Sequence, residues 1–255
     1  MTAGDQPAAG RPLQGRTALV TGGAVRIGRA IVEALSAAGA GVVIHYNHSH
    51  APAEQLRDRL VAAGGRAFVC PAELGEPAAA EGLFAAAEQQ AGPIDVVVNN
   101  ASIFPPSKVM EFAFDELAEN MRVNAYAPLA LARALAAAGR EGDVLNLLDT
   151  RMLDLDNGHA AYHLSKRTLS TLTRMLAMEL APRIRVNAIA PGLVLPPPGQ
   201  DETYLQANAH TNPLNTYGSA EEVARAAVFL LQSRFVTGQV LYVDGGRHMK
   251  GRLYE

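Results

Sequence analysis

The sequence predicts a single doubly wound α/β domain with a mostly parallel sheet. Seven short apolar runs are continuous rather than alternating, as expected for strands that helices cover on both faces. Helical stretches separate the runs, and no linker-like break interrupts the alternation. A length of 255 residues suits one large domain of this kind.

The order of the elements follows from hydrophobic periodicity. The predicted strands are Arg16–Thr21, Gly41–Tyr46, Arg66–Pro71, Ile94–Asn99, Gly142–Leu148, Ile184–Ala190 and Gln239–Val243. The predicted helices are Ile27–Ala38, Ala53–Ala63, Pro77–Gln90, Phe114–Ala138, Gly158–Leu180 and Ala220–Gln232. The first helix has apolar residues three and four positions apart, which gives it one apolar face. Gly39, Gly64 and Gly139 follow helices, as is typical of left-handed C-terminal caps.

Two segments lie outside this alternation. Residues 1–14 are polar and contain Gly and Pro, and they predict a flexible N-terminal tail before a domain over 15–255. Residues 191–217 are rich in proline and too long for a plain connector. This segment leaves the carboxyl end of a predicted strand, where doubly wound sheets bind ligands, so we expect a substrate lid. A disordered insertion is the alternative.

Composition excludes several classes of protein. Hydrophobic residues make up 49% and charged residues 18%, which excludes a disordered or fibrous chain. The formal net charge of −3 gives no basic excess, so we expect neither a nucleic-acid partner nor a membrane surface. No apolar h-region or membrane-spanning run is visible, and a cytoplasmic location is the expectation. The single cysteine, Cys70, lies in an apolar strand pattern and is expected to be a core residue.

A glycine turn joins the first predicted strand to the first helix. The segment Thr21–Gly28 contains Gly22, which suits a tight turn, and Gly28, which permits close backbone approach. The N–H groups at the start of the helix would face a pyrophosphate. The pattern therefore predicts a dinucleotide site, although a simple tight turn is the alternative.

The end of the second predicted strand concerns the choice of cofactor. Folds selective for NAD place an acid there, about 20 residues after the glycine turn, to bind the ribose 2′-hydroxyl. No Asp or Glu occurs between Gly41 and Ala53, whereas Arg26, Asn47, His48 and Ser49 offer donors. The pattern favours a 2′-phosphate and therefore NADP(H), although histidines of a solvated loop are the alternative. The histidine spacing matches no usual metal site, and we expect no metal.

Several motifs occur together in one order along the chain. They are the Thr21–Gly28 turn, Asn99–Ser102, Asn124, Tyr162-x-x-x-Lys166, Arg185–Asn187 with Pro191-Gly192, and Asp244–Gly246. With this combination the chain resembles the short-chain dehydrogenase/reductase family from Gly15 to Gly246. The resemblance implies a seven-stranded Rossmann-type fold, a nicotinamide cofactor and a homotetramer.

Tyr162 and Lys166 are the central catalytic candidates. They are four residues apart and therefore share one helix face. An ammonium group near a phenol favours the phenolate, so we expect Lys166 to lower the pKa of Tyr162. Tyr162 would then exchange a proton with the substrate, and Lys166 would also hold the nicotinamide ribose. The resemblance implies that Asn124 helps to relay the proton to solvent.

Three departures from the usual family pattern resemble the pteridine reductase branch. Asp149 stands thirteen residues before Tyr162, where most members have serine, Arg26 replaces the middle glycine of the turn, and Phe104 follows Asn100–Ser102. The resemblance implies that Asp149 works with Tyr162 and Lys166, and that Arg26 faces phosphate and pterin. It also implies that Phe104 stacks on the pterin. The alternatives are a strand-end cap for Asp149, a surface or phosphate-only arginine for Arg26, and a core aromatic residue for Phe104.

The sequence therefore predicts an NADPH-dependent reductase that acts on the C=N bond of a dihydropterin. The catalytic candidates are Asp149, Tyr162, Lys166 and Asn124. The cofactor-binding candidates are Gly22, Arg26, Ile27, Gly28, Tyr46, Asn47, His48, Ser49, Glu73, Leu74, Asn100, Ala101, Ser102, Tyr162, Lys166, Pro191 and Gly192. The substrate-binding candidates are Arg26, Ser102, Phe104, Asp149, Tyr162 and Leu193. The alternatives are a carbonyl reductase of the same family, acting on a 3-oxoacyl thioester or a sugar, and a non-catalytic NADPH-binding regulator.

Overall fold

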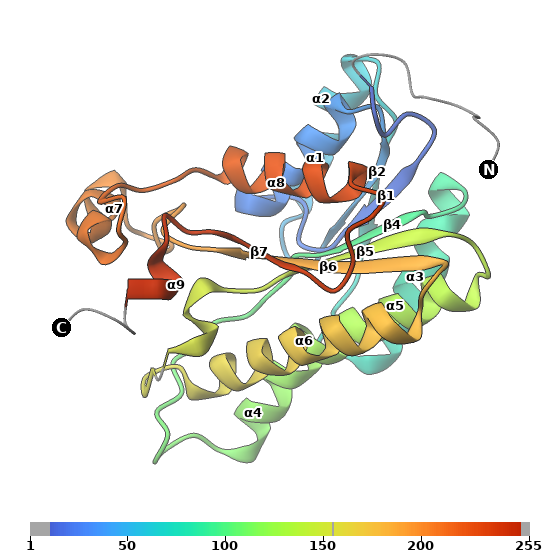
Figure 1. Ribbon diagram of the computed structural model, residues 1–255. Helices are drawn as coiled ribbons and strands as arrows, with labels where there is room; N and C mark the ends of the chain where they lie inside the picture. The colour runs from blue at the N-terminus through green and yellow to red at the C-terminus, as the bar shows by residue number, and fades with distance from the viewer. Residues whose placement is uncertain (1–10, 155, 251–255) are drawn as a thin grey trace.

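A seven-stranded parallel sheet forms the centre of the molecule (Figure 1). The computed structural model describes residues 11–154 and 156–250. The strand order is β3-β2-β1-β4-β5-β6-β7, and all paired strands are parallel. The strands are β1 (Thr17–Val20), β2 (Gly41–Tyr46), β3 (Ala67–Pro71), β4 (Val96–Asn99), β5 (Gly142–Leu147), β6 (Ile184–Pro191) and β7 (Val240–Val243). Each lies at a predicted strand, so the predicted fold class is confirmed.

Helices cover both faces of the sheet. Figure 1 shows α1, α2 and α8 on one face and α3, α5 and α6 on the other. The helices are α1 (Arg26–Ala37), α2 (His50–Ala62), α3 (Pro77–Ala91), α4 (Phe114–Met121), α5 (Ala127–Ala137), α6 (Ala160–Glu179), α7 (Glu202–Asn208), α8 (Ala220–Gln232) and α9 (Arg247–Lys250). One apolar core lies beneath α1 and α8, and a second lies beneath α3 and α5. None of the helices within residues 11–154 and 156–250 is long and apolar enough to cross a membrane.

The helix predicted over Phe114–Ala138 contains a wider turn. A π-helical segment, η1 (Arg122–Tyr126), joins α4 to α5. The N–H of Ala127 bonds to the carbonyl of Arg122, five residues earlier, which is the spacing of a π turn. The next residue but one after η1 is Pro128, which has no N–H for the carbonyl of Asn124. Single π turns within helices frequently mark functional sites. Here the wider turn contains Asn124.

The described residues of the two predicted irregular segments are ordered. Residues 11–14, the end of the predicted tail, form a turn in which Leu13 is buried and donates its N–H to the carbonyl of Ala38 at 2.9 Å. Leu13 therefore packs against the domain predicted to begin at residue 15, and residues 1–10 of the predicted tail lie outside the described residues. Segment 191–217 contains α7, with Leu205 buried, and the short 3-10 helix η3 (Ala209–Thr211). It is folded, in contrast to the alternative of a disordered insertion.

The strand order reverses beside β1. The chain builds the sheet outward from β1 to β3 and then returns to place β4 on the other side of β1. At such a reversal, the loops after the two strands lead away from each other and leave a crevice at the carboxyl ends. The glycine turn follows β1, and the segment Asn100–Phe104 follows β4. The topology therefore brings both predicted motifs to one crevice.

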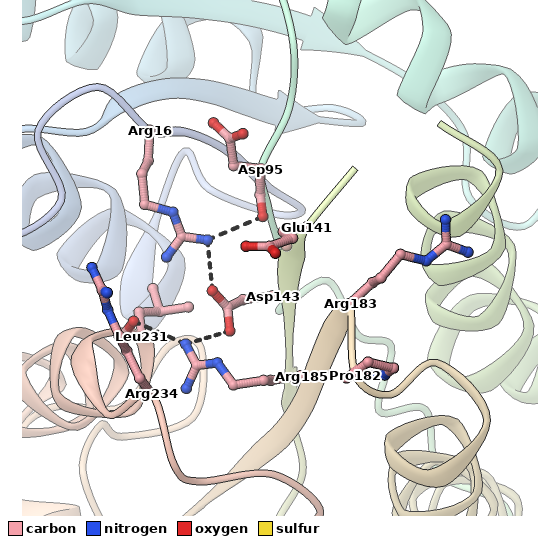
Figure 2. A pocket seen from close by; sticks show the side chains of 10 residues that line it. Arg16, Asp95, Glu141, Asp143, Pro182, Arg183, Arg185, Leu231 and Arg234 are labelled. Atoms are coloured by element: carbon pink, nitrogen blue, oxygen red, sulfur yellow. Dashed lines mark hydrogen bonds and ion pairs between the residues drawn. The ribbon is translucent and has the colours of Figure 1, made fainter. Parts of the chain in front are cut away.

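An ion triad closes the opposite end of the sheet (Figure 2). The buried carboxylate of Asp143, at the start of β5, accepts from Arg16 Nη2 at 2.6 Å and lies 2.5 Å from Arg185 Nη2. Arg185 also donates to the carbonyls of Leu230 and Leu231, near the end of α8. The triad therefore joins the sheet to α8 at the end remote from the crevice.

We expect Asp143→Asn to destabilise the fold, because the change leaves two partly buried guanidinium groups without their shared carboxylate. Breaking one partner of a buried ion pair costs several kcal/mol, and the partial exposure of both arginines reduces this to about 2 to 4 kcal/mol. Urea unfolding would measure the loss. The matched control is Glu141→Gln, because Glu141 is exposed and lines the surface cavity that Arg16, Asp143 and Arg185 also line. Equal stabilities for the two variants would contradict a structural role of the triad.

Candidate active site

The glycine turn is held tightly against the end of β4. Thr21 Oγ1 accepts the N–H groups of Asn100 and Ala101 at 2.9 and 3.0 Å, and Asn100 Nδ2 donates to the carbonyl of Gly22 at 3.0 Å. A Cβ atom on Gly28 would lie 2.1 Å from the Gly22 carbonyl oxygen, so only glycine fits there. Gly22 itself has a φ of 60°, in the left-handed region. The turn thus lies close to the start of α1, as a pyrophosphate-binding turn requires.

His45 supports this turn from β2, a role that the sequence analysis missed. Its Nδ1 accepts the N–H of Gly22 at 3.0 Å, and its Nε2 lies 3.1 Å from the carbonyl of Ala72. These backbone partners require a neutral ring with the hydrogen on Nε2. Burial lowers the pKa of His45 to about 4, although the bond to Ala72 opposes this shift. The sequence signal for this role was a histidine near the end of the predicted strand Gly41–Tyr46, which pairs with the strand before the glycine turn.

The ends of β2 and β3 place a carboxylate beside the predicted 2′-phosphate site. Asn47 Nδ2 donates to Glu73, which also accepts the N–H of Gly75 at 3.0 Å. The bond from Gly75 lowers the pKa of Glu73, and Asn47 adds to the effect. Tyr46 and Leu74 are buried, so their side chains belong largely to the core. His48 and Ser49 follow Asn47 before α2. Among residues 11–154 and 156–250, no group of three or more His, Cys, Asp or Glu side chains could hold a metal ion.

Most remaining candidates surround one cavity of about 210 Å³ at the crevice. Its lining includes the predicted residues Arg26, Ile27, Asn100, Ser102, Asp149, Tyr162, Lys166, Pro191 and Gly192. Leu193 points elsewhere and lines a neighbouring cavity, whereas Val194 and Leu195 line this one. The substrate contact of Leu193 stays a prediction, and Val194 and Leu195 are further candidates for it. The rest of the cavity wall is formed by Leu147 and Leu148.

The carboxylate of Asp149 is hydrogen-bonded to the phenol of Tyr162. Tyr162 Oη donates to Asp149 Oδ2 at 2.8 Å. Asp149 Oδ1 accepts the backbone N–H of Arg151 at 2.6 Å and thereby caps the 3-10 helix η2 (Thr150–Leu153). The alternative of a strand-end cap for Asp149 is therefore correct, but capping is only one of its two contacts. The two oxygens of the carboxylate have different partners, so Asp149 caps η2 through Oδ1 and accepts from Tyr162 through Oδ2.

The expected effect of Lys166 on Tyr162 is wrong for this structure. Burial raises the pKa of Tyr162 well above its ordinary value, and the charge and hydrogen bond of Asp149 raise it further. Lys166 Nζ donates to the carbonyl of Leu147 at 2.8 Å and lies 5.8 Å from the centre of the Tyr162 ring. Burial lowers the pKa of Lys166 to about 8, although Asp149 opposes this shift. Tyr162 is therefore held as a neutral phenol, a proton donor.

Asn124 ties the loop after β4 to the catalytic helix. Its Oδ1 accepts from Ile103 N at 2.9 Å and Ser102 Oγ at 3.1 Å. Its Nδ2 donates to Ile103 O at 3.1 Å and to Ser165 Oγ of α6 at 3.0 Å. The side chain of Asn124 therefore fixes the residues that precede Phe104 relative to the helix that carries Tyr162. Ser165 was not among the predicted site residues.

Phe104 lies at the edge of the site, and half of its surface is exposed. Its ring stacks on His159, with centroids 4.0 Å apart and planes 12° from parallel. It meets the Tyr162 ring nearly perpendicularly at 4.5 Å. The alternative of a core aromatic residue is therefore wrong. Since the ring is both ordered by neighbours and exposed, it offers an aromatic surface beside Tyr162.

Arg26 reaches from the glycine turn to segment 191–217. Its Nη2 donates to the carbonyl of Pro196 at 2.7 Å. Its φ of 55° lies in the left-handed region, which is uncommon for a residue with a Cβ atom. Backbone strain of this kind clusters at functional sites. Arg26 is thus an exposed residue, as the surface alternative has it, but it also lines the cavity and contacts segment 191–217.

We expect acid to destabilise the fold through His45. Because its folded-state pKa is depressed, the unfolded chain binds the extra proton more readily, so stability is fully present above pH 6.5 and is lost as the pH falls toward 4. The difference between the two pKa values corresponds to about 3 kcal/mol. Urea unfolding at pH 7 and pH 4.5 would measure it, with the non-titrating variant His45→Asn as control. A wild-type loss no larger than that of the variant would contradict this role.

Comparison with known proteins identifies the family. The model for the family described as enoyl-(acyl carrier protein) reductase matches residues 23–248. A solved structure of FolM alternative dihydrofolate reductase 1 from Brucella canis, complexed with NADP, is 38% identical, with a TM-score of 0.87 over 94% of this chain and 96% of that one.

Two curated relatives have similar coverage. Versicolorin reductase 1 of Aspergillus parasiticus is 33% identical over 92% of this chain and 97% of its own length. The L-xylulose reductase of Bos taurus is 35% identical over the same shares. With the glycine turn, the Tyr162 and Lys166 pair and the seven-stranded parallel sheet, these matches show that the chain belongs to the short-chain dehydrogenase/reductase family.

Proposed function

We propose that this protein is an NADPH-dependent reductase that transfers hydride to a C=N bond of a pteridine such as a dihydropterin. The observation that carries the proposal is the hydrogen bond of 2.8 Å from Tyr162 to the Asp149 carboxylate inside the cavity. Both a carbonyl and a C=N substrate must gain a proton, on oxygen or on nitrogen, when hydride reaches the carbon. Only an aminopyrimidine also offers N–H groups that a carboxylate accepts.

The residues of the crevice fit a dinucleotide. The close turn at Gly22 and Gly28 and the start of α1 would hold the pyrophosphate, and Lys166 would bind the nicotinamide ribose. When bound, NADPH supplies the hydride. His48, Ser49 and Arg26 would favour the 2′-phosphate. Glu73, which Asn47 holds nearby, limits that preference because its negative charge opposes the phosphate. The NADP in the Brucella canis structure supports this choice of cofactor.

The proton is delivered by Tyr162 and Asp149 acting together. Because burial and Asp149 keep Tyr162 protonated, its O–H is available for donation to a nitrogen that enters the cavity. After the transfer, the phenol oxygen carries a negative charge beside a carboxylate. The ammonium of Lys166, buried in the same cavity, offsets this charge, and its lowered pKa of about 8 makes it a suitable acid to return the proton.

A flat heteroaromatic ring suits the rest of the site. The exposed surface of Phe104, next to the ring of Tyr162, would stack against one face of a pterin. The polar lining near Arg26 and Ser102 would face the ring substituents. The FolM alternative dihydrofolate reductase relatives support a pteridine-like substrate, although the versicolorin and xylulose reductases favour a ketone as the second candidate.

We expect Asp149→Ser to separate these two candidates. With a dihydropterin, loss of the carboxylate should lower the turnover number by about 10²- to 10⁴-fold, the usual contribution of a general acid–base group. With a ketone, serine restores the usual family arrangement, and turnover should hold or rise. NADPH oxidation should be measured for wild type and variant with dihydrobiopterin, dihydrofolate and an activated ketone. Unchanged dihydropterin turnover in the variant would reject the role of Asp149.

We expect Phe104→Ala to weaken pteridine binding and to leave the affinity for NADPH nearly unchanged. Aromatic stacking contributes about 0.5–1.5 kcal/mol beyond buried area, so the KM for a dihydropterin should rise several-fold or more. Phe104→Tyr, which keeps the ring, is the matched control. Equal losses of cofactor and pteridine affinity would show that Phe104 supports the fold rather than the substrate.

A further inference from the structure

Asp156 lies outside the cavity but contacts several groups that border the site. It stands in the loop between η2 and α6, with a side chain that is 15% exposed. Its Oδ1 accepts the N–H of Gly158 at 2.7 Å. Its Oδ2 lies 3.0 Å from Arg151 Nη2, 3.2 Å from His159 Nδ1 and 3.6 Å from His163 Nε2. Four groups from one short stretch of chain therefore converge on a single carboxylate.

Asp156 is a stable anion in this position. Burial alone would raise its pKa, but the hydrogen bonds from Gly158 and His159 and the charge of Arg151 outweigh that effect and lower the pKa to about 2. The carboxylate is therefore charged throughout the range in which the enzyme could be assayed. Its hold on Arg151 and His159 does not depend on its own titration.

One branch of these contacts leads to the catalytic carboxylate. Arg151 is held at its guanidinium group by Asp156, and its backbone N–H donates to Asp149 Oδ1 at 2.6 Å. The other oxygen of Asp149 accepts from Tyr162. A change in the position of Arg151 would therefore rotate or release the carboxylate that faces the reacting proton.

The second branch leads to the aromatic surface. His159 is held at Nδ1 by Asp156, and its ring stacks on Phe104 at 4.0 Å. The carbonyl and hydroxyl groups of Ser107 anchor the start of α6 through Ala160 and Ala161, which limits the movement of this histidine. The plane of Phe104 is thus set by a ring that is itself fixed by Asp156.

We propose that Asp156 is a positioning residue that orients both Asp149 and Phe104 for the reaction. The inference rests on the proposed function insofar as Phe104 stacks on the substrate. Asp156 touches neither of these side chains directly. It acts through Arg151 on the proton-transfer side and through His159 on the stacking side, so one carboxylate coordinates two otherwise separate parts of the site.

The decisive variant is Asp156→Asn, with Asp154→Asn as its matched control. Asp154 also contacts Arg151, at 3.5 Å, but its side chain is 54% exposed. Because small displacements of reacting groups are costly, we expect Asp156→Asn to lower kcat/KM for a dihydropterin by about 10- to 100-fold, through both kcat and KM. We expect Asp154→Asn to stay within about twofold of wild type, consistent with a weak exposed ion pair. The NADPH dissociation constant, measured in parallel, should change little in either variant, and the melting temperature of Asp156→Asn should fall by only a few degrees, without a matching loss of NADPH binding.

Changes at His159 separate the two branches. His159→Ala should raise the KM for a dihydropterin with little effect on kcat. His159→Phe, which keeps the stack but loses the contact with Asp156, should restore the KM only in part. If Asp156→Asn instead lowers NADPH affinity and melting temperature in proportion to activity, its role is structural and the proposal is wrong. Unchanged kinetics would overturn it as well.

Failure of the proposed function is distinguishable from failure of this inference. If the wild-type enzyme reduces ketones and no pteridine, the proposed substrate is wrong. The effect of Asp156 on Asp149 is then measured from kcat for that ketone, because Asp149 and Tyr162 contact each other whichever substrate is bound. A kcat for Asp156→Asn equal to that for Asp154→Asn would reject the positioning role in that case too.

Discussion

The close approach of the first turn to the end of β4 is the constraint on which the rest of the site depends. Thr21 and Asn100 join the two loops through their side chains, and the absence of a Cβ atom on Gly28 lets α1 begin against them. Since β1 and β4 are neighbours only because the strand order reverses there, sheet topology and local hydrogen bonding enforce the same geometry. His45 adds a third strand to this junction through its bond to Gly22.

The electrostatics of the cavity differ from a simple pairing of phenol and ammonium. Asp149 stabilises the neutral phenol of Tyr162, while burial disfavours the charge on Lys166. The raised pKa of Tyr162 keeps the proton on the phenol before substrate binds, whereas the lowered pKa of Lys166 moves that group closer to neutral pH, where a general acid works best. A serine in place of Asp149 would remove the first effect. Aspartate in place of the usual serine at position 149 therefore strengthens the preference of Tyr162 for the neutral phenol before substrate binds.

The sequence predicted the sheet and the main site well because both depend on local patterns. Continuous apolar runs marked all seven strands, and the spacing of Tyr162 and Lys166 placed both in one cavity. Contacts between distant segments were not visible. Glu73 was a cofactor-binding candidate, but it approaches Asn47 only because β2 and β3 pair in parallel register, so its place beside the predicted 2′-phosphate site was not visible in the residues after β2. The π-helical turn at Asn124 is followed by Pro128, which has no N–H for the Asn124 carbonyl, and the sequence pattern showed only a continuous helix there.

The residues that sequence reasoning missed share one property. His45, Ser165 and Asp156 contact other site residues rather than the cavity, and their residue types are unremarkable at their positions along the chain. A catalytic side chain must present a particular chemical group, whereas a supporting side chain needs only a hydrogen-bonding atom in the right place. Many sequences can satisfy that second requirement, so only the three-dimensional arrangement identifies the residues that do. In this enzyme His45 supports the glycine turn and Ser165 supports Asn124, whereas the contacts of Asp156 lead to two of the three departures from the family pattern, Asp149 and Phe104.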